Sequence, residues 1–465
     1  MNLLYKNRLL FIVLACLFVL VNCEEDTVFN EGPFLSKRTN ILSFQFQNLD
    51  PPVEATVNQD EKLITATLPF GSDISALIPT ITVSEKASVS PASGIANDFT
   101  NEVIYTVNAE NGDTQNYRVL VELSEPDATT VLALSNPVWN LSPSGTGVPS
   151  YFTQDGERGI AYGNGKIYLT NNNDQVVILD AATGEQQGLL DMTDVDGGGP
   201  KIADVNVSDD GTILACNSVE FTSDGGGEPT VFKIYKWDDD AATPEVFLSY
   251  TNTEYRMGDS FSVIGDIQTN AVILTTFGRK FLNPTTRGSL IFRWNVINGV
   301  VDENPTLVTV AGVPSLTRFG SRPHAQLLDV DSESYYVNAN DIDFTKVDLS
   351  GSFENRIPNS GRALYDGFTS YFEIFQFAGK TVIAAAFPRS SIESRLLVID
   401  ITEGIENVTN DDVILSQDFM AGTTIGNANA SGAVTVNIVN QNKVEIYCLI
   451  TNQAVAKFDL TTEAE

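Results

Sequence analysis

Apolar and polar residues alternate with a period of two over residues 41–123. The alternating segments are ILSFQFQ, LITATL, TITV, EVIYTVNAE and YRVLVEL. Such alternation places successive side chains on opposite faces of a strand and predicts a half-buried sheet. The last two segments are joined by Asn111-Gly112-Asp113, whose Asn-Gly pair readily adopts positive φ in a tight hairpin. We therefore expect residues 39–124 to form a small antiparallel β-sandwich, with Tyr105 and Tyr117 packed inside it.

Beyond a linker around Pro126, the pattern becomes a loose repeat of strand pairs. Six segments open on an apolar or alternating strand and pass through a turn into a second strand: RGIAYGNGKIYLTN, IADVNVSDDGTILACN, DSFSVIGDIQTNAVILTT, HAQLLDVDSESYYVN, SYFEIFQFAGKTVIAAA and GAVTVNIVNQNKVEIYCLI. Their strands start at Arg158, Ile202, Ser260, His324, Ser370 and Gly432, so the spacings are 44, 58, 64, 46 and 62 residues.

A four-stranded propeller blade takes about 40 to 50 residues, and the longer units would carry loop insertions. Residues 129–465 are thus expected to form a β-propeller, with six blades favoured and seven possible. The segment VLALSNPVWNL, which begins at Val131, could supply an outer strand beside the C-terminal strands and so hide an exposed sheet edge. The predicted fold class is all-β throughout.

The N-terminus has the pattern of a secretory signal. Lys6 and Arg8 precede an apolar run from Leu9 to Val21, and these 13 residues are too few to span a bilayer comfortably. Residues 1–22 are therefore expected to be a signal peptide, and residues 23–38, which are polar and contain Gly and Pro, a flexible tether.

The end of the apolar run, Leu20-Val21-Asn22-Cys23, resembles the lipobox of bacterial lipoproteins, with Asn22 where that pattern has a small residue. The resemblance implies that Cys23 is lipidated and becomes the N-terminus of the mature protein. The following Glu24-Glu25-Asp26 resembles the surface-export signal of Bacteroidetes-type lipoproteins. Together they imply a protein anchored by lipid in the outer membrane and displayed at the cell surface. The alternative is an ordinary signal peptide with an incidental cysteine.

Composition narrows the possible chemistry. Sixty acidic residues against 27 basic ones give a net charge of −33, which repels nucleic-acid phosphates and makes nucleic acid an unexpected partner. A single histidine, His324, excludes zinc sites built on several histidines. Cys216 and Cys448 lie in apolar strands and are expected to be small buried residues, the alternative being a disulfide between neighbouring blades.

No linear motif for catalysis, a metal or a cofactor stands out. His324 is accompanied by no Gly-x-Ser-x-Gly, and the Gly-rich stretches lack the lysine of a phosphate loop. The run from Asp191 to Gly197 faintly resembles the start of a calcium loop, but Pro200 and Lys201 interrupt it. We therefore expect no cofactor and no metal site.

Propeller geometry nevertheless suggests where a site would form. The loops that lead into the first strand of each repeat converge at one end of a propeller, and five chemically capable residues lie at those strand starts. The candidate binding residues are Arg158, Asp204, Asp259, His324 and Tyr371. Their alternative role is structural, in a solvated rim and in ion pairs between blades.

Two resemblances suggest what the chain does. The segments TLPFGSDISALIPTITVS and DFTNEVIYTVNAENGDTQNYRVLVE resemble the immunoglobulin- or cadherin-like domain at the N-terminus of many Bacteroidetes surface lipoproteins. Residues 129–465 resemble a family of uncharacterised propeller lipoproteins from the same bacteria. The first resemblance implies a spacer domain, and it bears on location more than on activity. For the whole chain we expect a non-enzymatic binding or scaffold protein that contacts a glycan, a protein or a partner in a surface complex. The alternatives are a carbohydrate-active hydrolase or lyase, which would need two carboxylates roughly 5 to 10 Å apart, and a purely structural or sensory role.

Overall fold

The computed structural model describes residues 35–463 apart from several internal segments. The segments left out are 48, 50–51, 70–71, 73, 125–129, 143–144, 153–156, 172, 220–228, 253–254, 278–287, 315–318, 320–322, 340–341, 359–370, 389–393 and 419–430. The predicted signal peptide, Cys23 and most of the tether lie outside the described residues. Within them the chain forms two compact units, the first of which ends at Ser124.

Strands dominate both units. In the described part of the chain there is no α-helix, and the helical turns are two 3-10 segments, η1 (Ile405–Asn407) and η2 (Asn410–Asp412). None of the described helical segments is long or apolar enough to span a membrane. The all-β fold class is therefore confirmed.

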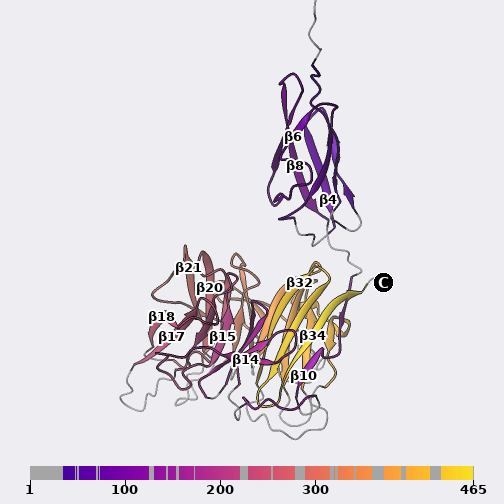
Figure 1. The fold of residues 1–465 in the computed structure, drawn as a ribbon. Coiled ribbons are helices and arrows are strands. Elements are labelled where there is room, and N and C mark those ends of the chain that lie inside the picture. The colour runs from indigo at the N-terminus through magenta and orange to yellow at the C-terminus, as the bar shows by residue number, and fades with distance from the viewer. Residues whose placement is uncertain are drawn as a thin grey trace, which may run out of the picture. The chain divides into compact units, whose positions relative to one another are not determined.

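The first unit packs two sheets around one core (Figure 1). One sheet has the order β2–β1–β5 and the other β3–β4–β8–β7–β6. The strands are β1 (Ile41–Phe46), β2 (Val53–Glu54), β3 (Thr56–Asn58), β4 (Leu63–Leu68), β5 (Pro79–Val83), β6 (Ser88–Ser90), β7 (Val103–Asn108) and β8 (Thr114–Leu123). The expectation of a purely antiparallel sandwich is wrong at one place, because β4 and β8 run parallel. The chain between them passes through the other sheet, which is the long crossover that parallel neighbours require.

Aromatic rings fill the core of the first unit. The Phe44 ring makes edge contacts with Phe46, Phe99 and Tyr105, at centroid distances of 5.5, 6.5 and 5.3 Å. Tyr105 and Tyr117 are fully buried, as expected. Each buried hydroxyl has a partner, since Tyr105 Oη accepts a hydrogen bond from Asn97 and Tyr117 Oη donates one to Gln59.

The second unit contains six antiparallel sheets among its described residues (Figure 1). Sheets one to three are built from β11 (Ile160–Gly163), β12 (Lys166–Thr170), β13 (Val176–Asp180) and β14 (Gln186–Leu189); β15 (Asp204–Val207), β16 (Ile213–Cys216), β17 (Thr230–Trp237) and β18 (Glu245–Asn252); and β19 (Phe261–Gly265), β20 (Asn270–Phe277), β21 (Leu290–Ile297), β22 (Val300–Val301) and β23 (Thr306–Thr309).

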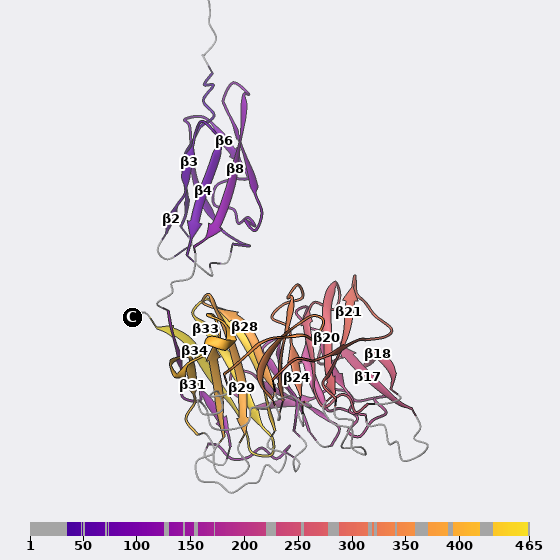
Figure 2. The same cartoon turned by 180° about the vertical axis from the view of Figure 1, so that it is seen from behind.

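Sheets four to six complete the unit (Figure 2). They are built from β24 (His324–Gln326), β25 (Ser334–Ala339), β26 (Ile342–Asp348) and β27 (Phe353–Arg356); β28 (Phe372–Phe377), β29 (Lys380–Pro388), β30 (Ser394–Asp400) and β31 (Val413–Leu415); and β32 (Gly432–Asn440), β33 (Lys443–Ile450), β34 (Ala454–Glu463), β10 (Trp139–Leu141) and β9 (Val131–Leu134).

The predicted repeats correspond to these sheets. Each of the six segments forms the first two strands of one sheet. The segment VLALSNPVWNL forms β9 and β10, and both pair with β34, so the last sheet takes its outer strands from the start of the unit, as expected.

Apolar clusters hold successive sheets together. Among the described residues there are six apolar clusters, and each combines side chains of two sheets. Five of them join each sheet to the next, from sheet one to sheet six, and the last joins sheet six to sheet one. Strand β12 shows the principle, because Ile167 and Leu169 lie in the cluster shared with sheet six, whereas Tyr168 between them lies in the cluster shared with sheet two. Burial of both faces explains why these strands are apolar runs rather than alternating ones.

The first strands of the six sheets contact each other in the same order. Strand β11 contacts β15, β15 contacts β19, β19 contacts β24, β24 contacts β28, β28 contacts β32, and β32 contacts β11. Polar side chains on these strands are therefore brought together from segments far apart in the sequence. The two cysteines among the described residues, Cys216 and Cys448, are buried and form no disulfide, as expected, so the alternative of a disulfide between blades is wrong.

Candidate functional site

The predicted site residues lie at or just before the starts of the first strands, and Asp259 is the centre of their contacts. Its carboxylate binds Arg256 through Nε at 2.6 Å and Nη2 at 2.7 Å, and Arg158 through Nη1 at 3.2 Å. Burial acts to raise the pKa of Asp259, but the two guanidinium charges and these hydrogen bonds outweigh it and lower the pKa below its ordinary value. Tyr371 donates from Oη to the Asp259 carbonyl oxygen at 2.9 Å.

His324 and Asp204 are buried beside this cluster. The His324 ring lies 5.4 Å from the Tyr371 ring, and its nitrogens are 3.3 and 3.4 Å from the hydroxyls of Ser260 and Ser262. Burial lowers the pKa of His324 to about 4, so the imidazole is neutral at physiological pH. The Asp204 carboxylate accepts hydrogen bonds from two backbone amides, those of Val205 and Phe261, each at 2.9 Å.

The structure thus brings the five predicted residues into one neighbourhood. Arg158, Asp259, Tyr371 and His324 are in direct contact, and Asp204 reaches them through the strand β19 that follows Asp259. Only the side chains of Arg158 and Asp259 keep notable exposure, 25% each, whereas Asp204, His324 and Tyr371 are 5 to 6% exposed. The last three therefore have little surface to offer a ligand, and a binding role for this group stays a prediction.

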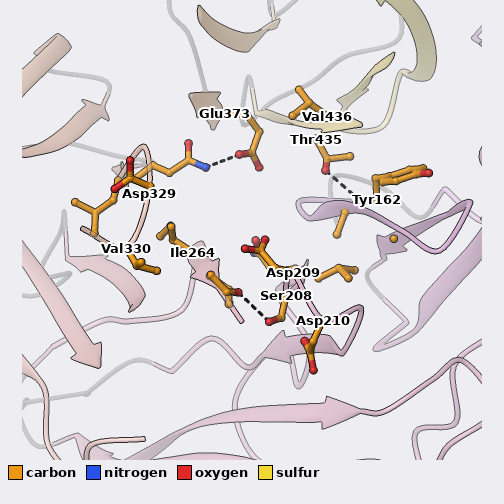
Figure 3. Close-up of a pocket in the computed structure, with 18 of the residues that line it drawn as sticks. Tyr162, Ser208, Asp209, Asp210, Ile264, Asp329, Val330, Glu373, Thr435 and Val436 are labelled. Carbon is orange, nitrogen blue, oxygen red and sulfur yellow. Dashed lines mark hydrogen bonds between the residues drawn. The ribbon is translucent and has the colours of Figure 1, made fainter. Parts of the chain in front are cut away.

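Residues of the same six strands and of the turns that follow them line a cavity of about 730 Å³ (Figure 3). Its volume lies in the range of small-molecule and cofactor sites. Side chains and turns of β11, β15, β19, β24, β28 and β32 contribute to it. The polar residues that line it include Tyr162, Asn206, Ser208, Asp209, Asp210, Gln326, Asp329, Glu373 and Thr435.

Hydrogen bonds between neighbouring first strands fix the wall of this cavity. Thr435 Oγ1 accepts from the Tyr162 amide at 3.1 Å, which joins sheets six and one. Ser208 Oγ donates to the Gly265 carbonyl at 2.9 Å, which joins sheets two and three. Gln326 accepts from the Ile374 amide at 2.9 Å and donates to the Glu373 carboxylate, which joins sheets four and five. A wall held in this way is preorganised for a ligand.

One glycine is required at the cavity wall. Gly265 has φ of +92°, and a Cβ there would lie 2.5 Å from Val330 Cγ1 and 2.6 Å from the Asn270 carbonyl oxygen. A side chain would therefore both strain the backbone and collide with the wall.

Two acidic side chains that line the cavity have pKa values above their ordinary ones. Burial raises the pKa of Glu373 to about 7, against the opposing hydrogen bond from Gln326. Burial also raises the pKa of Asp209, with further contributions from the charges of Asp266 and Asp210. Perturbed acids in a concave site are a common mark of a functional centre.

None of the five residues predicted from the sequence is among the described residues that line this cavity. Asp209 and Asp210 are the turn between β15 and β16, as their sequence suggests, and nothing in a turn motif shows that it borders a cavity. Glu373 offered a stronger signal, because it is the one charged residue in the strand FEIFQF, whose other residues are apolar except for Gln376. An isolated acid on a strand that is buried on both faces is costly unless the site uses it.

In the run Asp191 to Gly197, protein groups bind two of the carboxylates. Asp191 accepts hydrogen bonds from the amide and the hydroxyl of Thr193, and the Asp196 carboxylate binds Lys233 and Tyr235. No group of three or more metal-ligating side chains occurs among the described residues.

Comparisons with known families match two parts of the chain. Residues 41–121, most of the first unit, match the family model described as SGBP, N-terminal. Residues 163–334, which run from the end of β11 into β25, match a domain of unknown function, DUF8500. No curated protein matches the chain.

Solved structures extend the comparison. A DUF4623 family protein from Bacteroides eggerthii is 17% identical, with a TM-score of 0.56 over 92% of this chain and 99% of that one. This likeness shows a shared fold over nearly the whole chain. An α-L-arabinofuranosidase from Fusarium graminearum is 10% identical, with a TM-score of 0.44 over 70% of this chain and 98% of that one. A putative secreted protein from Bacteroides fragilis is 19% identical, with a TM-score of 0.15 over 20% of this chain and 97% of that one. The match of residues 41–121 supports a surface protein of Bacteroidetes type.

Proposed function

We propose that the protein is a cell-surface glycan-binding protein without catalytic activity, held at the outer membrane by a lipid on Cys23. The match of residues 41–121 to the N-terminal domain of surface glycan-binding proteins supports the ligand class and the location. The signal-like segment and the acidic residues after Cys23 support the anchor. In this proposal the first unit is an immunoglobulin-like spacer, and the second unit carries the glycan site.

We further infer that the six sheets close into a six-bladed β-propeller. Support comes from the apolar clusters, which join each sheet to the next and the sixth to the first. The contact order of the first strands, in which β32 touches β11, supports the same closure. Pairing of β9 and β10 with β34 also covers an edge that an open array would leave exposed.

The cavity in Figure 3 is the observation that carries the glycan proposal. Sugars present many hydroxyl groups and an apolar ring face, and they need hydrogen-bonding partners together with an aromatic or apolar surface. The cavity supplies hydrogen-bonding partners through Asn206, Asp209 and Glu373, and apolar surface through Ile264 and Val330. Tyr162 lies on its wall, with the ring packed on Tyr447 at 5.7 Å, so this residue holds the wall in place.

One observation favours a second candidate, a carbohydrate-active hydrolase or lyase. With its pKa raised to about 7, Glu373 has the protonation of a general acid at neutral pH. The other acid with a pKa raised to about 7, Asp204, does not line the cavity and has its carboxylate bound to two backbone amides. Binding without turnover therefore fits the geometry better.

Titration calorimetry of the purified protein against a panel of polysaccharides, with a parallel assay for released reducing ends, tests both candidates. We expect at least one polysaccharide to bind without degradation, and Tyr162→Ala to weaken that binding tenfold or more. Tyr250→Ala is the matched control, because Tyr250 is also a half-buried, ring-packed tyrosine but lies on β18, away from this cavity. Equal loss in both variants, or no binding to any polysaccharide, would contradict the glycan proposal, and released sugars would favour the hydrolase.

A further inference from the structure

We propose that the cavity selects uncharged glycans and rejects chains that carry uronic acids, an inference that rests on the proposed glycan-binding function. Four acidic residues line the cavity, Asp209, Asp210, Asp329 and Glu373, and no lysine, arginine or histidine is among its described lining residues. They come from three different sheets, as Figure 3 shows for the labelled side chains.

In the part of the chain that the structure describes, no cation neutralises the four carboxyl groups. None of the ion pairs among the described residues includes any of the four. Elsewhere the chain pairs many of its partly buried acids, as with Asp259 and the two arginines, Asp400 and Lys380, and Glu445 and Lys457. The cavity is therefore a concave surface of one sign, which focuses its negative potential on anything that enters it.

Two of the four acids have roles in local turns, but their charge remains. Asp210 accepts from Thr212 Oγ1 at 2.6 Å, and Asp329 accepts from Ser332 Oγ at 3.0 Å. The Asp209 carboxylate takes part in no hydrogen bond among the described residues, and the Glu373 carboxylate has only the Gln326 amide. These two carboxyl groups have free lone pairs that can accept hydrogen bonds from sugar hydroxyls.

The same groups repel a carboxylate. Near Asp209 a further negative charge is already disfavoured, because burial raises the pKa of its carboxyl and the charges of Asp266 and Asp210 raise it further. A uronate would bring another negative charge into this space and would lose its hydration without gaining an opposite charge. Neutral sugars can donate hydroxyl hydrogens to the same oxygens without that loss.

The test uses one glycan in two charge states. A neutral polysaccharide that binds is oxidised selectively at its primary C6 hydroxyls, which converts those positions to uronates and keeps the linkages. Affinities for the parent and the oxidised chain are measured by calorimetry at low and at high ionic strength. We expect the oxidised chain to bind at least tenfold more weakly at low salt, and the difference to narrow at high salt, because salt screens the repulsion.

Variants identify the source of the discrimination. Asp209→Asn removes one cavity charge and is expected to reduce the ratio of parent to oxidised affinity at least threefold. Asp331→Asn is the control, because Asp331 lies in the same turn as Asp329 but outside the cavity lining, and it should leave the ratio at the wild-type value.

The outcomes separate this inference from the proposed function. Equal affinity for both chains at low salt, or an unchanged ratio in Asp209→Asn, overturns the charge selection while glycan binding stands. Absence of binding to any neutral polysaccharide overturns both.

Discussion

Replacing Asp204 with asparagine tests how the polar interior is built. Asp204 begins β15 and is 5% exposed. Burial raises the pKa of its carboxyl from 3.8 to about 7, with a smaller contribution from the charge of Glu373 and with opposition from two backbone hydrogen bonds. The carboxyl is therefore harder to ionise in the folded chain than in the unfolded one.

The sign and size of the effect follow from proton linkage. Between pH 4 and pH 7 the folded state keeps a proton on Asp204 that the unfolded state has lost, so the free energy of unfolding decreases as pH rises through this window and is constant above it. For the shift from 3.8 to about 7, the decrease between pH 5.5 and pH 7.5 is about 2 kcal/mol. Asp204→Asn cannot ionise and should lose this part of the pH dependence.

Tryptophan fluorescence during urea unfolding measures this quantity selectively. All three tryptophans of the chain, Trp139, Trp237 and Trp294, lie in the second unit, so the signal reports on the unit that contains Asp204. The slope with pH is the readout, because asparagine also weakens one of the two backbone hydrogen bonds at every pH. Asp194→Asn, an exposed turn substitution, should keep the wild-type slope. If Asp204→Asn keeps it too, the assigned burial of the carboxyl is wrong.

Three further substitutions probe the contacts between sheets, each measured by urea unfolding. Gly159→Ala should cost about 1 to 3 kcal/mol, because its Cβ would lie 2.3 Å from Asp204 Oδ1, whereas Gly188→Ala has no atom within 4 Å and should be nearly neutral. Asp259→Ala should cost about 1 to 3 kcal/mol, since it leaves two guanidinium groups without their carboxylate, and a neutral result would show that this cluster is solvated. Trp139→Ala should cost about 2 to 4 kcal/mol, because the indole of β10 donates to the Ala181 carbonyl and so joins sheets six and one; retention of full stability would argue against that joint.

Much of the fold could be predicted from the sequence because the patterns that indicate its strands and turns are local. A strand that is buried on both faces appears in the sequence as a continuous apolar run. Turn residues such as glycine, asparagine and aspartate mark the end of that run. Six such pairs could therefore be found, and the pairing of VLALSNPVWNL with the C-terminal strands could be foreseen. The parallel neighbours β4 and β8 could not, because their pairing depends on the path of the chain through a second sheet.

The candidate site was less accessible because it depends on distant contacts. The expectation that residues at the first-strand starts meet is consistent with the contacts of Asp259, but the sequence does not show that Arg256 shares its carboxylate. The cavity lies where turns such as Asp209-Asp210 border strands of other sheets, and its depth is set by side chains far apart in the chain. Only Glu373, an acid in an apolar strand, marked the site locally.

Glu373 connects the stability of the second unit to its proposed function. Burial raises the pKa of its carboxyl from 4.5 to about 7, so the ionised form costs stability as pH rises between those values. Glu373→Gln removes that cost and keeps an oxygen that can accept from Gln326. We expect the variant to be more stable than the wild type by about 3 kcal/mol at pH 8 and by less than about 0.5 kcal/mol at pH 4.5.

The same variant separates the reasons for keeping an acid at this position. If the carboxylate serves glycan selection, Glu373→Gln should gain stability at pH 8 and lose part of the discrimination against oxidised chains. A variant that gains stability and discriminates as well as the wild type would show that the acid has no part in the site. An uncharged side chain of the same shape would stabilise the folded chain at neutral pH. If Glu373→Gln also discriminates as well as the wild type, the acid in β28 has no functional reason.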